Sequence, residues 1–344
     1  MRLRWSIIIA VLFVATMCGT NARGQKKHIE KVEKVEKTKV KDVKEVEHEE
    51  REEREERAVA VQPGVVITLC MESGKITVRG DDRREVRAQV PKGTKIDFGR
   101  AGDASANSPA ARLEVMVAED DDEEEDAPHF GQCSGSADIE LEVPRDATLF
   151  LKSEKADFDI EAVAEAHLET NSGNIAIRRV TRAVEATTTE GDVLLEDSKG
   201  RVRLESFGGS VEAINVSQTM EGDFFRAKSI SNDIMLERVT HSRVEVSTIS
   251  GEITVTGPLA RYAHYEMRTT SGDITLTMPP DSSFRLSAKV SEGGEIVTDF
   301  PLKYTGGLNT DRLLSAGQMV GTYGKGDATI NLASYSGTLR LKRQ

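Results

Sequence analysis

Thr270-Ser-Gly-Asp-Ile274 is the clearest copy of a five-residue phrase that occurs six times in this chain. The earlier copies keep the same apolar and turn-forming positions and are Asn171-Ser-Gly-Asn-Ile175, Thr189-Glu-Gly-Asp-Val193, Phe207-Gly-Gly-Ser-Val211, Ile230-Ser-Asn-Asp-Ile234 and Ile249-Ser-Gly-Glu-Ile253. Their middle residues are Gly173, Gly191, Gly209, Asn232, Gly251 and Gly272. They recur about every 20 residues, the range of repeat folds in which each repeat is one supersecondary unit. Because Gly and Asn adopt φ > 0 most readily, we predict a turn at each.

Apolar residues alternate with other residues on both sides of each predicted turn. Two and four places after the turn lie Ile175/Ile177, Val193/Leu195, Val211/Ala213, Ile234/Leu236, Ile253/Val255 and Ile274/Leu276. Seven and five places before it lie Ala166/Leu168, Val184/Ala186, Val202/Leu204, Phe225/Ala227, Val244/Val246 and Tyr265/Met267. A spacing of two predicts a β-strand on each side. Three places before the turn, on the same inward side, lie Thr170, Thr188, Ser206, Ser229, Thr248 and Thr269, which indicates a hydroxyl ladder that satisfies its own hydrogen bonds.

Two architectures fit this pattern. In a β-solenoid each repeat is one coil that stacks on the previous one at a strand spacing of about 4.8 Å. In a β-meander or a sandwich of hairpins each repeat is a hairpin closed by the turn. The constant offset of large and small apolar residues favours the solenoid, and looser copies occur at Glu72-Ser-Gly-Lys-Ile76, Ser291-Glu-Gly-Gly-Glu-Ile296, Lys325-Gly-Asp-Ala328 and Tyr335-Ser-Gly-Thr-Leu339. We predict an all-β, single-stranded parallel β-solenoid over residues 60–344, with the hairpin fold as the alternative.

The first 24 residues have the pattern of a secretory signal peptide. Arg2 and Arg4 precede an apolar run over residues 5–17, and small residues follow as far as Gly24. The apolar run is short for a membrane span, which needs about 20 residues. We predict cleavage after Ala22 or Gly24, with lipidation of Cys18 as the alternative, and therefore an exported protein that is periplasmic, outer-envelope-associated or extracellular.

Residues 25–59 form a charged spacer. Lys and Glu dominate residues 26–57, from which Pro and Gly are absent, so the segment can be helical with many Glu/Lys neighbours at i, i+4. Its apolar stripe is thin, and strict heptads would place Glu36 and Lys39 in the seam. A solvated, partly helical tail is therefore favoured over a coiled coil, although the spacer offers a possible route to oligomers.

The charge of the chain excludes some partners. The formal net charge is −12, and acidity of this degree argues against nucleic acid and anionic lipid as partners. A contact with a membrane is expected only through an uncleaved signal or a partner. Residues 119–126 are acidic at every position and are predicted to form a disordered loop, because they lack the alternating ligands and glycine of a calcium loop.

Cysteine usage leaves one question open. After removal of the signal peptide, Cys70 and Cys133 remain in a compartment that permits disulfides. They can form a bridge or remain as two buried thiols, because sequence spacing alone does not show whether their Cα atoms lie close enough.

Catalytic signatures are weak. Asp192, Asp233, Glu252 and Asp273 share the position after the turn residue, so in a solenoid they would form a row that binds a cation or, as in polysaccharide-cleaving β-helix enzymes, supplies acid and base groups. Asn174 and Ser210 interrupt this row, and all these residue types are common in turns. Gly131-Gln-Cys-Ser-Gly135 has the shape of a nucleophile elbow but is followed by a strand pattern instead of a helix. We predict no catalytic residue, no cofactor and no metal site, with a cation-binding row as a minor alternative.

Three further segments carry a family resemblance: Val66-Ile-Thr-Leu69, Ser73-Gly-Lys-Ile-Thr-Val-Arg-Gly80 and Ile139-Glu-Leu-Glu-Val-Pro144. Together with the repeated phrases, they resemble the bacterial putative-adhesin family of unknown function, a toastrack-like β-solenoid class, over residues 60–344. The resemblance implies an envelope-associated, non-enzymatic domain that offers an adhesin-like or scaffolding surface and, in some members, is linked to envelope stress sensing. It supplies no catalytic residues.

The functional hypothesis is therefore a secreted binding module that presents a repetitive β-surface to an envelope protein or a surface polymer. The first alternative is an envelope-stress sensor that captures cationic peptides or metal ions on its acidic surface. A polysaccharide lyase or hydrolase is the least favoured hypothesis.

Overall fold

The computed structural model describes residues 54–100, 108–119, 133–304 and 317–344, and all regular structure in them is β-strand. They belong to the second of two compact units, Glu53–Gln344; the first, Met1–Glu52, lies outside the described residues. The predicted signal peptide, residues 25–53 of the spacer and residues 120–126 of the acidic loop therefore also lie outside them. The all-β prediction is confirmed, but residues 54–59, assigned above to the spacer, are part of the first strand. The described residues include no helix that is long and apolar enough to cross a membrane.

The repeating unit is a coil of two short strands joined by the predicted turn. β7 (Glu165–Ser172) leads through Gly173 into β8 (Ile175–Arg178). The following coils are β9 (Ala183–Glu190) with β10 (Val193–Glu196), β11 (Arg201–Ser206) with β12 (Val211–Ser217), β13 (Phe225–Ser229) with β14 (Ile234–Thr240), β15 (Arg243–Ser247) with β16 (Ile253–Thr256), and β17 (His264–Ser271) with β18 (Ile274–Met278).

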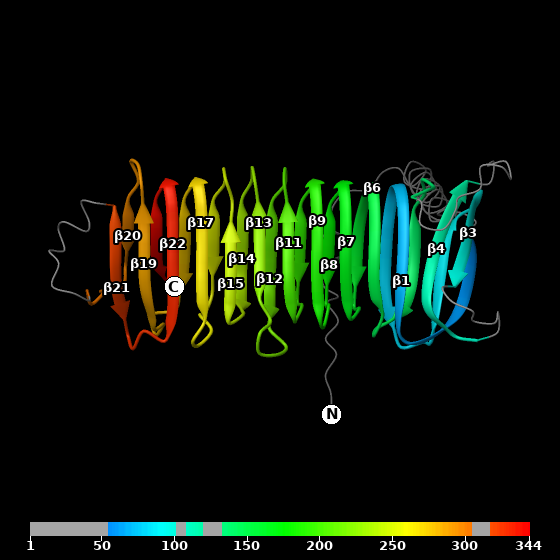
Figure 1. Ribbon diagram of the computed structural model, residues 1–344, viewed down its shortest axis with the longest axis horizontal. Helices are drawn as coiled ribbons and strands as arrows, with labels where there is room; N and C mark the ends of the chain where they lie inside the picture. Colours follow the sequence, from blue (N-terminus) through cyan, green and yellow to red (C-terminus); the bar gives the residue numbers. More distant parts are fainter. Residues whose placement is uncertain (1–53, 101–107, 120–132, 305–316) are drawn as a thin grey trace, which may run out of the picture. The chain divides into compact units, whose positions relative to one another are not determined.

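Each strand of a coil pairs in parallel with the equivalent strand of the next coil. The register is constant, because Val193 pairs with Val211 and Val211 with Ile234, two places after successive turn residues. The solenoid is confirmed for these coils, and the alternative of hairpins is wrong for them, because their ladders are parallel. We call the face that contains β7, β9, β11, β13, β15 and β17 sheet 1, and the face that contains β8, β10, β12, β14, β16 and β18 sheet 2 (Figure 1).

The two ends of the stack are built differently. Their strands are β1 (Arg54–Asp81), β2 (Glu85–Pro91), β3 (Thr94–Arg100), β4 (Ala110–Glu119), β5 (Ile139–Pro144) and β6 (Thr148–Glu161) at one end, and β19 (Phe284–Val290), β20 (Ile296–Thr298), β21 (Gln318–Tyr323), β22 (Ala328–Ser336) and β23 (Leu339–Arg343) at the other. β3 pairs antiparallel with β4, β2 with β1 and β5, and β21 with β19. Antiparallel strands therefore border both ends of the parallel stack.

The order of the coils in space also departs from the sequence at both ends. The last coil, β22–β23, lies between β17–β18 and β19–β20, so the red β22 stands between the yellow β17 and the orange β19 in Figure 1. At the other end, β1 lies between β4–β5 and β6. The loose copy of the phrase at Lys325 is consequently not a coil turn, because it immediately precedes β22. The turn residue of the β22–β23 coil is Gly337, which occupies the position equivalent to Gly272 in the adjacent coil.

The core consists of the inward-facing residues of both sheets. All the apolar positions predicted from the six phrases are buried and belong to one hydrophobic cluster, which includes Val202, Phe225 and Tyr265. Because strand side chains alternate, each coil contributes a thin layer that packs against the layers above and below it. One coil was missed in the sequence: Phe158 pairs with Ile175, so Ala156 takes the place of the turn glycine.

The predicted hydroxyl row is buried, but its hydrogen bonds run along the stack to the backbone. Ser206 Oγ donates to the carbonyl of Gly191 at 2.8 Å, and Ser229 Oγ donates to that of Gly209 at 3.0 Å. The same bond joins Thr188, Thr248, Thr269 and Ser334 to the turn residue of the neighbouring coil. The hydroxyls therefore satisfy the carbonyls of the turns instead of one another.

The turn residues are selected mainly by close approach. A Cβ on Gly191 would lie 2.1 Å from the carbonyl oxygen of Gly173, although its φ of +150° also favours glycine. Left-handed non-glycine residues occur towards the opposite turn in several coils: Asp197 follows β10 with a φ of 48°, and Asn215 lies near the end of β12 with a φ of 56°. The sequence offered no repeated glycine there, so this second turn was not predicted.

Candidate interaction surface

The row of polar residues after the turn is a hydrogen-bonded ladder along one edge of the stack. Asp192 Oδ1 accepts from the backbone N–H of Ser210 at 2.7 Å, and Asp233 Oδ1 accepts from that of Glu252 at 2.7 Å. Asn174 continues the ladder, because its side-chain oxygen accepts from the N–H of Asp192 at 2.9 Å. Each of these side chains therefore satisfies a turn amide of the next coil, which explains why Asp and Asn share this position.

Asp273 ends the predicted row and has a second partner. Its Oδ1 accepts from the Thr338 N–H at 2.7 Å, and its Oδ2 accepts from Arg340 at 2.6 Å. The hydrogen bond from Thr338, and then that from Arg340, lower the pKa of this carboxyl below its ordinary value. Within the described ranges, no three His, Cys, Asp or Glu side chains are grouped so that they could hold a metal ion.

The two cysteines lie in adjacent coils at the N-terminal end of sheet 1. Cys70 and Cys133 form a disulfide, with Cα atoms 4.4 Å apart. The chain that carries Cys133 runs beside β1, since the N–H of Glu72 donates to the carbonyl of Gly135 at 3.1 Å. The bridge thus ties the chain that leads into β5 to the neighbouring coil.

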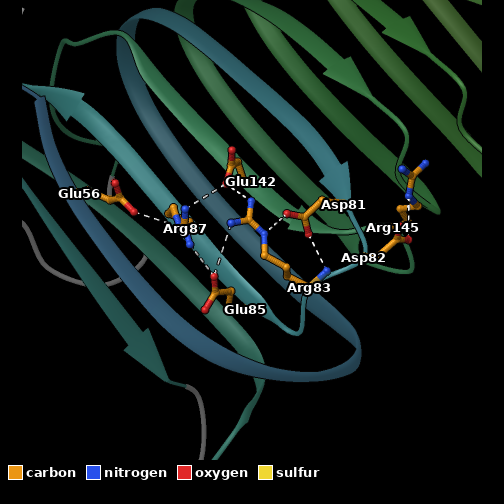
Figure 2. Close-up of polar contacts among 8 residues, drawn as sticks. All are labelled: Glu56, Asp81, Asp82, Arg83, Glu85, Arg87, Glu142 and Arg145. Atoms are coloured by element: carbon orange, nitrogen blue, oxygen red, sulfur yellow. Dashed lines mark hydrogen bonds and ion pairs between the residues drawn. The ribbon is translucent and has the colours of Figure 1, made fainter.

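Arginine and carboxylate side chains form a network on sheet 2 near the N-terminal end. Arg87 lies at its centre, with Glu85 at 2.8 Å, Glu56 at 3.0 Å and Glu142 at 3.8 Å. Figure 2 shows that Arg83 also reaches Glu142, so these side chains join β1, β2 and β5. The network links the antiparallel strands at this end to the first parallel strands.

The same network extends round the adjacent turn. Arg83 contacts Asp81, and Asp82 pairs with Arg145 at 3.0 Å (Figure 2). Because these side chains are largely exposed and already paired, water screens them, and each pair contributes little to stability. We interpret the network as a stabilising feature of this end of the stack.

The outer face of sheet 1 has a first depression over β6, β7 and β9, of about 430 Å³. Its walls include Phe150 and His167, whose rings stack with centroids 4.5 Å apart and planes 6° apart. Phe150 is 44% exposed, which is unusual for a Phe. Lys152 and Glu169, paired at 2.9 Å, lie beside the rings. The depression therefore combines an aromatic edge with hydrogen-bonding charged groups.

A second depression, of about 370 Å³, lies on the same face over β13, β15 and β17. Glu245 stands in its wall and accepts hydrogen bonds from Arg226 at 2.5 Å and from Arg243 at 2.6 Å. Partial burial raises the pKa of Glu245, but the hydrogen bonds from the two guanidinium groups outweigh this effect and lower it. Arg268 and Glu266 form the far wall.

The match to a protein-family model agrees with this architecture. The family model described as Toastrack DUF4097 matches residues 73–342. The chain belongs to the Toastrack DUF4097 family. The match includes both depressions and all the coils from β7 to β18 of this Toastrack protein, whereas Cys70 lies just outside it.

Two solved structures are similar to this Toastrack protein. A putative adhesin from Parabacteroides merdae shares 12% identity with a TM-score of 0.40, over 67% of this chain and 90% of that one. A putative cell adhesion protein from Clostridium sporogenes shares 10% identity with a TM-score of 0.19, over 85% of this chain and all of that one (100%). No curated protein matches.

Proposed function

We propose that this protein is a non-enzymatic, exported binding module that holds an extended envelope protein or surface polymer against the outer face of sheet 1. The observation that carries the proposal is the position of both depressions on that one face. Parallel strands repeat side chains at about 4.8 Å, so an extended partner can contact several coils with one kind of interaction.

The proposal of export is supported by the signal pattern of residues 1–24 and by the Cys70–Cys133 disulfide, which is typical of oxidising compartments. The two similar structures are a putative adhesin and a putative cell adhesion protein, and the role proposed for this chain is likewise adhesin-like.

The test is a binding assay with the full-length chain on isolated peptidoglycan sacculi and on purified envelope polysaccharides. Phe150→Ala should weaken binding by about tenfold, since aromatic side chains in interfaces commonly contribute more than 1 kcal/mol. Tyr262→Ala is the matched control, because Tyr262 is an aromatic residue that is 82% exposed and lies outside both depressions. Equal loss in both variants would contradict the proposal, and binding by neither the parent chain nor the variants would exclude a surface polymer as the partner.

A second candidate function is capture of cationic peptides on sheet 2. Glu212 lies on its outer face, Asp192 and Asp233 lie at the turns of the two adjacent coils, and none of these three forms an ion pair with a described basic side chain. Titration with a short polylysine should then show binding that disappears above about 0.3 M salt, because the Debye length falls well below 10 Å. Binding that does not change with salt would exclude this function.

A further inference from the structure

The four coils from β11 to β18 carry opposite charges on their two faces. On sheet 1 the outward basic residues are Arg201, Arg203, Arg226, Lys228, Arg243 and Arg268, and the outward acidic residues are Glu205, Glu245 and Glu266. On sheet 2 the outward acidic residues are Glu212 and Glu237 and the outward base is Arg238, while Asp233, Glu252 and Asp273 lie at the adjoining edge, in the turns that lead into β14, β16 and β18. A chain whose formal net charge is −12 thus has a locally positive face. We call these two surfaces the basic face and the acidic face.

Part of this charge is not neutralised within the described part of the chain. Arg201 and Lys228 form no ion pair there, and Arg203 reaches its nearest carboxylate, that of Glu185, only at 3.7 Å. On the acidic face, Glu212 has no ion-pair partner among the described residues, and Glu252 contacts only Thr254 Oγ1, at 3.3 Å. Both faces therefore keep charge available for a partner.

The two faces also share one axial repeat. The basic face comes from β11, β13, β15 and β17, and the acidic face from β12, β14, β16 and β18 of the same four coils. When two copies lie side by side with parallel axes and no axial offset, each basic row of one copy meets an acidic row of the other. An unrelated partner would need this spacing by coincidence, whereas a second copy has it by construction.

The acidic face adds an apolar contact at its centre. Met235 on β14 is 50% exposed. Glu212 on β12 lies between Met235 and the half-buried Leu194 on β10. On the basic face, the exposed ring of Phe207 lies beside Lys228, whose Nζ is 5.8 Å from the ring centroid. Lys and Arg stems cover apolar surface while their charged ends pair with acids, so a basic face is suited to such a mixed surface.

We propose that the basic face of one molecule binds the acidic face of a second copy of this chain, and that this lateral contact repeats. The contact is heterologous, since each molecule uses two different surfaces, and such contacts produce open rows or rings instead of closed dimers. Lateral rows of solenoids would present many copies of the sheet edges and turns to the same side. The basic face includes the second depression, so over β13, β15 and β17 this contact excludes the extended partner proposed above.

The test is sedimentation velocity of the full-length chain over a range of concentrations in 20 mM and in 500 mM NaCl. Concentration-dependent association is expected at the lower salt and its loss at the higher salt, because surface charge pairs are screened. Association that is equal at both salt concentrations, or absent at both, would overturn the proposal.

Charge reversal tests the pairing of the faces. Variant one, Arg201→Glu with Lys228→Glu, makes both faces acidic; variant two, Glu212→Lys with Glu237→Lys and Glu252→Lys, makes both faces basic. Neither variant should associate alone, and each should weaken association by about tenfold or more, since like charges in contact suppress binding. An equimolar mixture of the two should associate again, because each changed face then meets a complementary one.

The matched control changes the same charges at a coil edge. Lys199→Glu and Glu190→Lys alter exposed residues at turns and should leave association unchanged. If variants one and two still associate alone, the contact lies elsewhere in the chain and the proposal is wrong. Failure of the mixture to associate, with both variants folded by circular dichroism, would also reject it. Binding to sacculi, measured with the Phe150→Ala pair described above, reports separately on the other proposal.

Discussion

The central coils and the two ends of this protein differ in strand direction and in the order of the coils. From β7 to β18 every coil repeats the same turn, rows and parallel register. At the ends, β2, β3 and β21 run antiparallel to their neighbours, and two coils stand out of sequence order. Each central coil can pair with another coil of the same kind, so the repeat itself does not determine where the stack ends.

Edges are the reason why the ends differ. The last strand of an open sheet exposes unpaired N–H and C=O groups to which another chain can add, and repeat proteins need distinct caps to prevent this. Here the capping part of β1 carries Arg54, Glu56 and Arg57, and Glu56 pairs with Arg87 on β2. Charged antiparallel strands thus disfavour pairing at the edge, while the lateral faces remain available.

The disulfide is the covalent difference between the N-terminal end and the centre. It closes a loop with a sequence separation of 63 residues, so the Cys70→Ser/Cys133→Ser variant should lose about 4 kcal/mol of stability on the chain-entropy model. Hydrogen exchange should show the loss in β1, β4 and β5, with protection of β11 to β15 retained. If protection falls equally in all coils, the ends and the centre unfold as one unit and the distinction fails.

Replacing a buried side chain by alanine should lower the stability of the protein more in the central coils than at an end. Leu204 is fully buried on β11 and packs between two coils, so Leu204→Ala should destabilise by about 3 kcal/mol. Met319, on the bordering strand β21, has a coil on one side only, and Met319→Ala should cost about 1–2 kcal/mol. Urea denaturation compares the two variants; a larger loss for Met319→Ala would reverse the ranking.

Alanine substitution of two glycines distinguishes the cost of a close backbone approach from the cost of a positive φ. In Gly191→Ala the new Cβ meets a backbone oxygen at 2.1 Å, so about 2–3 kcal/mol should be lost. Gly93, in the turn that connects β2 to β3, has φ of +89°, and no atom lies within 4 Å of the place that a methyl group would take, so Gly93→Ala should cost only about 1 kcal/mol. Thermal or urea unfolding measures both, and equal losses would show that φ alone selects glycine.

One buried histidine makes the centre sensitive to pH. His241 is fully buried, its Nε2 lies 2.7 Å from the Gly200 carbonyl oxygen, and its Nδ1 has no partner in the described residues. Burial lowers its pKa from the ordinary 6.5, so the unfolded chain binds the proton more readily. Its contribution is therefore complete above pH 6.5 and declines as the pH falls towards the folded pKa, by at most about 1.4 kcal/mol per pH unit.

The check is urea denaturation of the parent chain and of His241→Gln between pH 7.5 and pH 5. The parent should lose more stability than the variant on acidification. Identical slopes in the two proteins would remove His241 as the cause.

Much of the central architecture follows from residues that are close in sequence. The positions of Val202, Leu204 and Val211 around Gly209 specified strands, faces and stacking, because a period of two on both sides of a turn leaves few alternatives. The turn at Ala156 escaped notice, since alanine carries no turn signal, and only the pairing of Phe158 with Ile175 shows the coil.

The candidate surface was less accessible from the sequence. Phe150 and His167 lie on different strands and belong to no repeated phrase. The stacking of their rings follows only from the pairing of β6 with β7. The same holds for Arg226 and Glu245, which are joined across coils. The acidic row is recognisable in the sequence from its constant position after the turn residue. Its hydrogen bonds to turn amides become visible only when the coils are stacked.

The sequence by itself determined the coil: its length, its two strands, its inward rows and its glycine turn, because these depend on neighbours within about 20 residues. Only the tertiary structure decided how the stack ends, where β22–β23 is inserted and which charges share a face. Those features depend on contacts between residues that are distant in the chain, such as Met267 with Leu332, and no local period encodes such a choice.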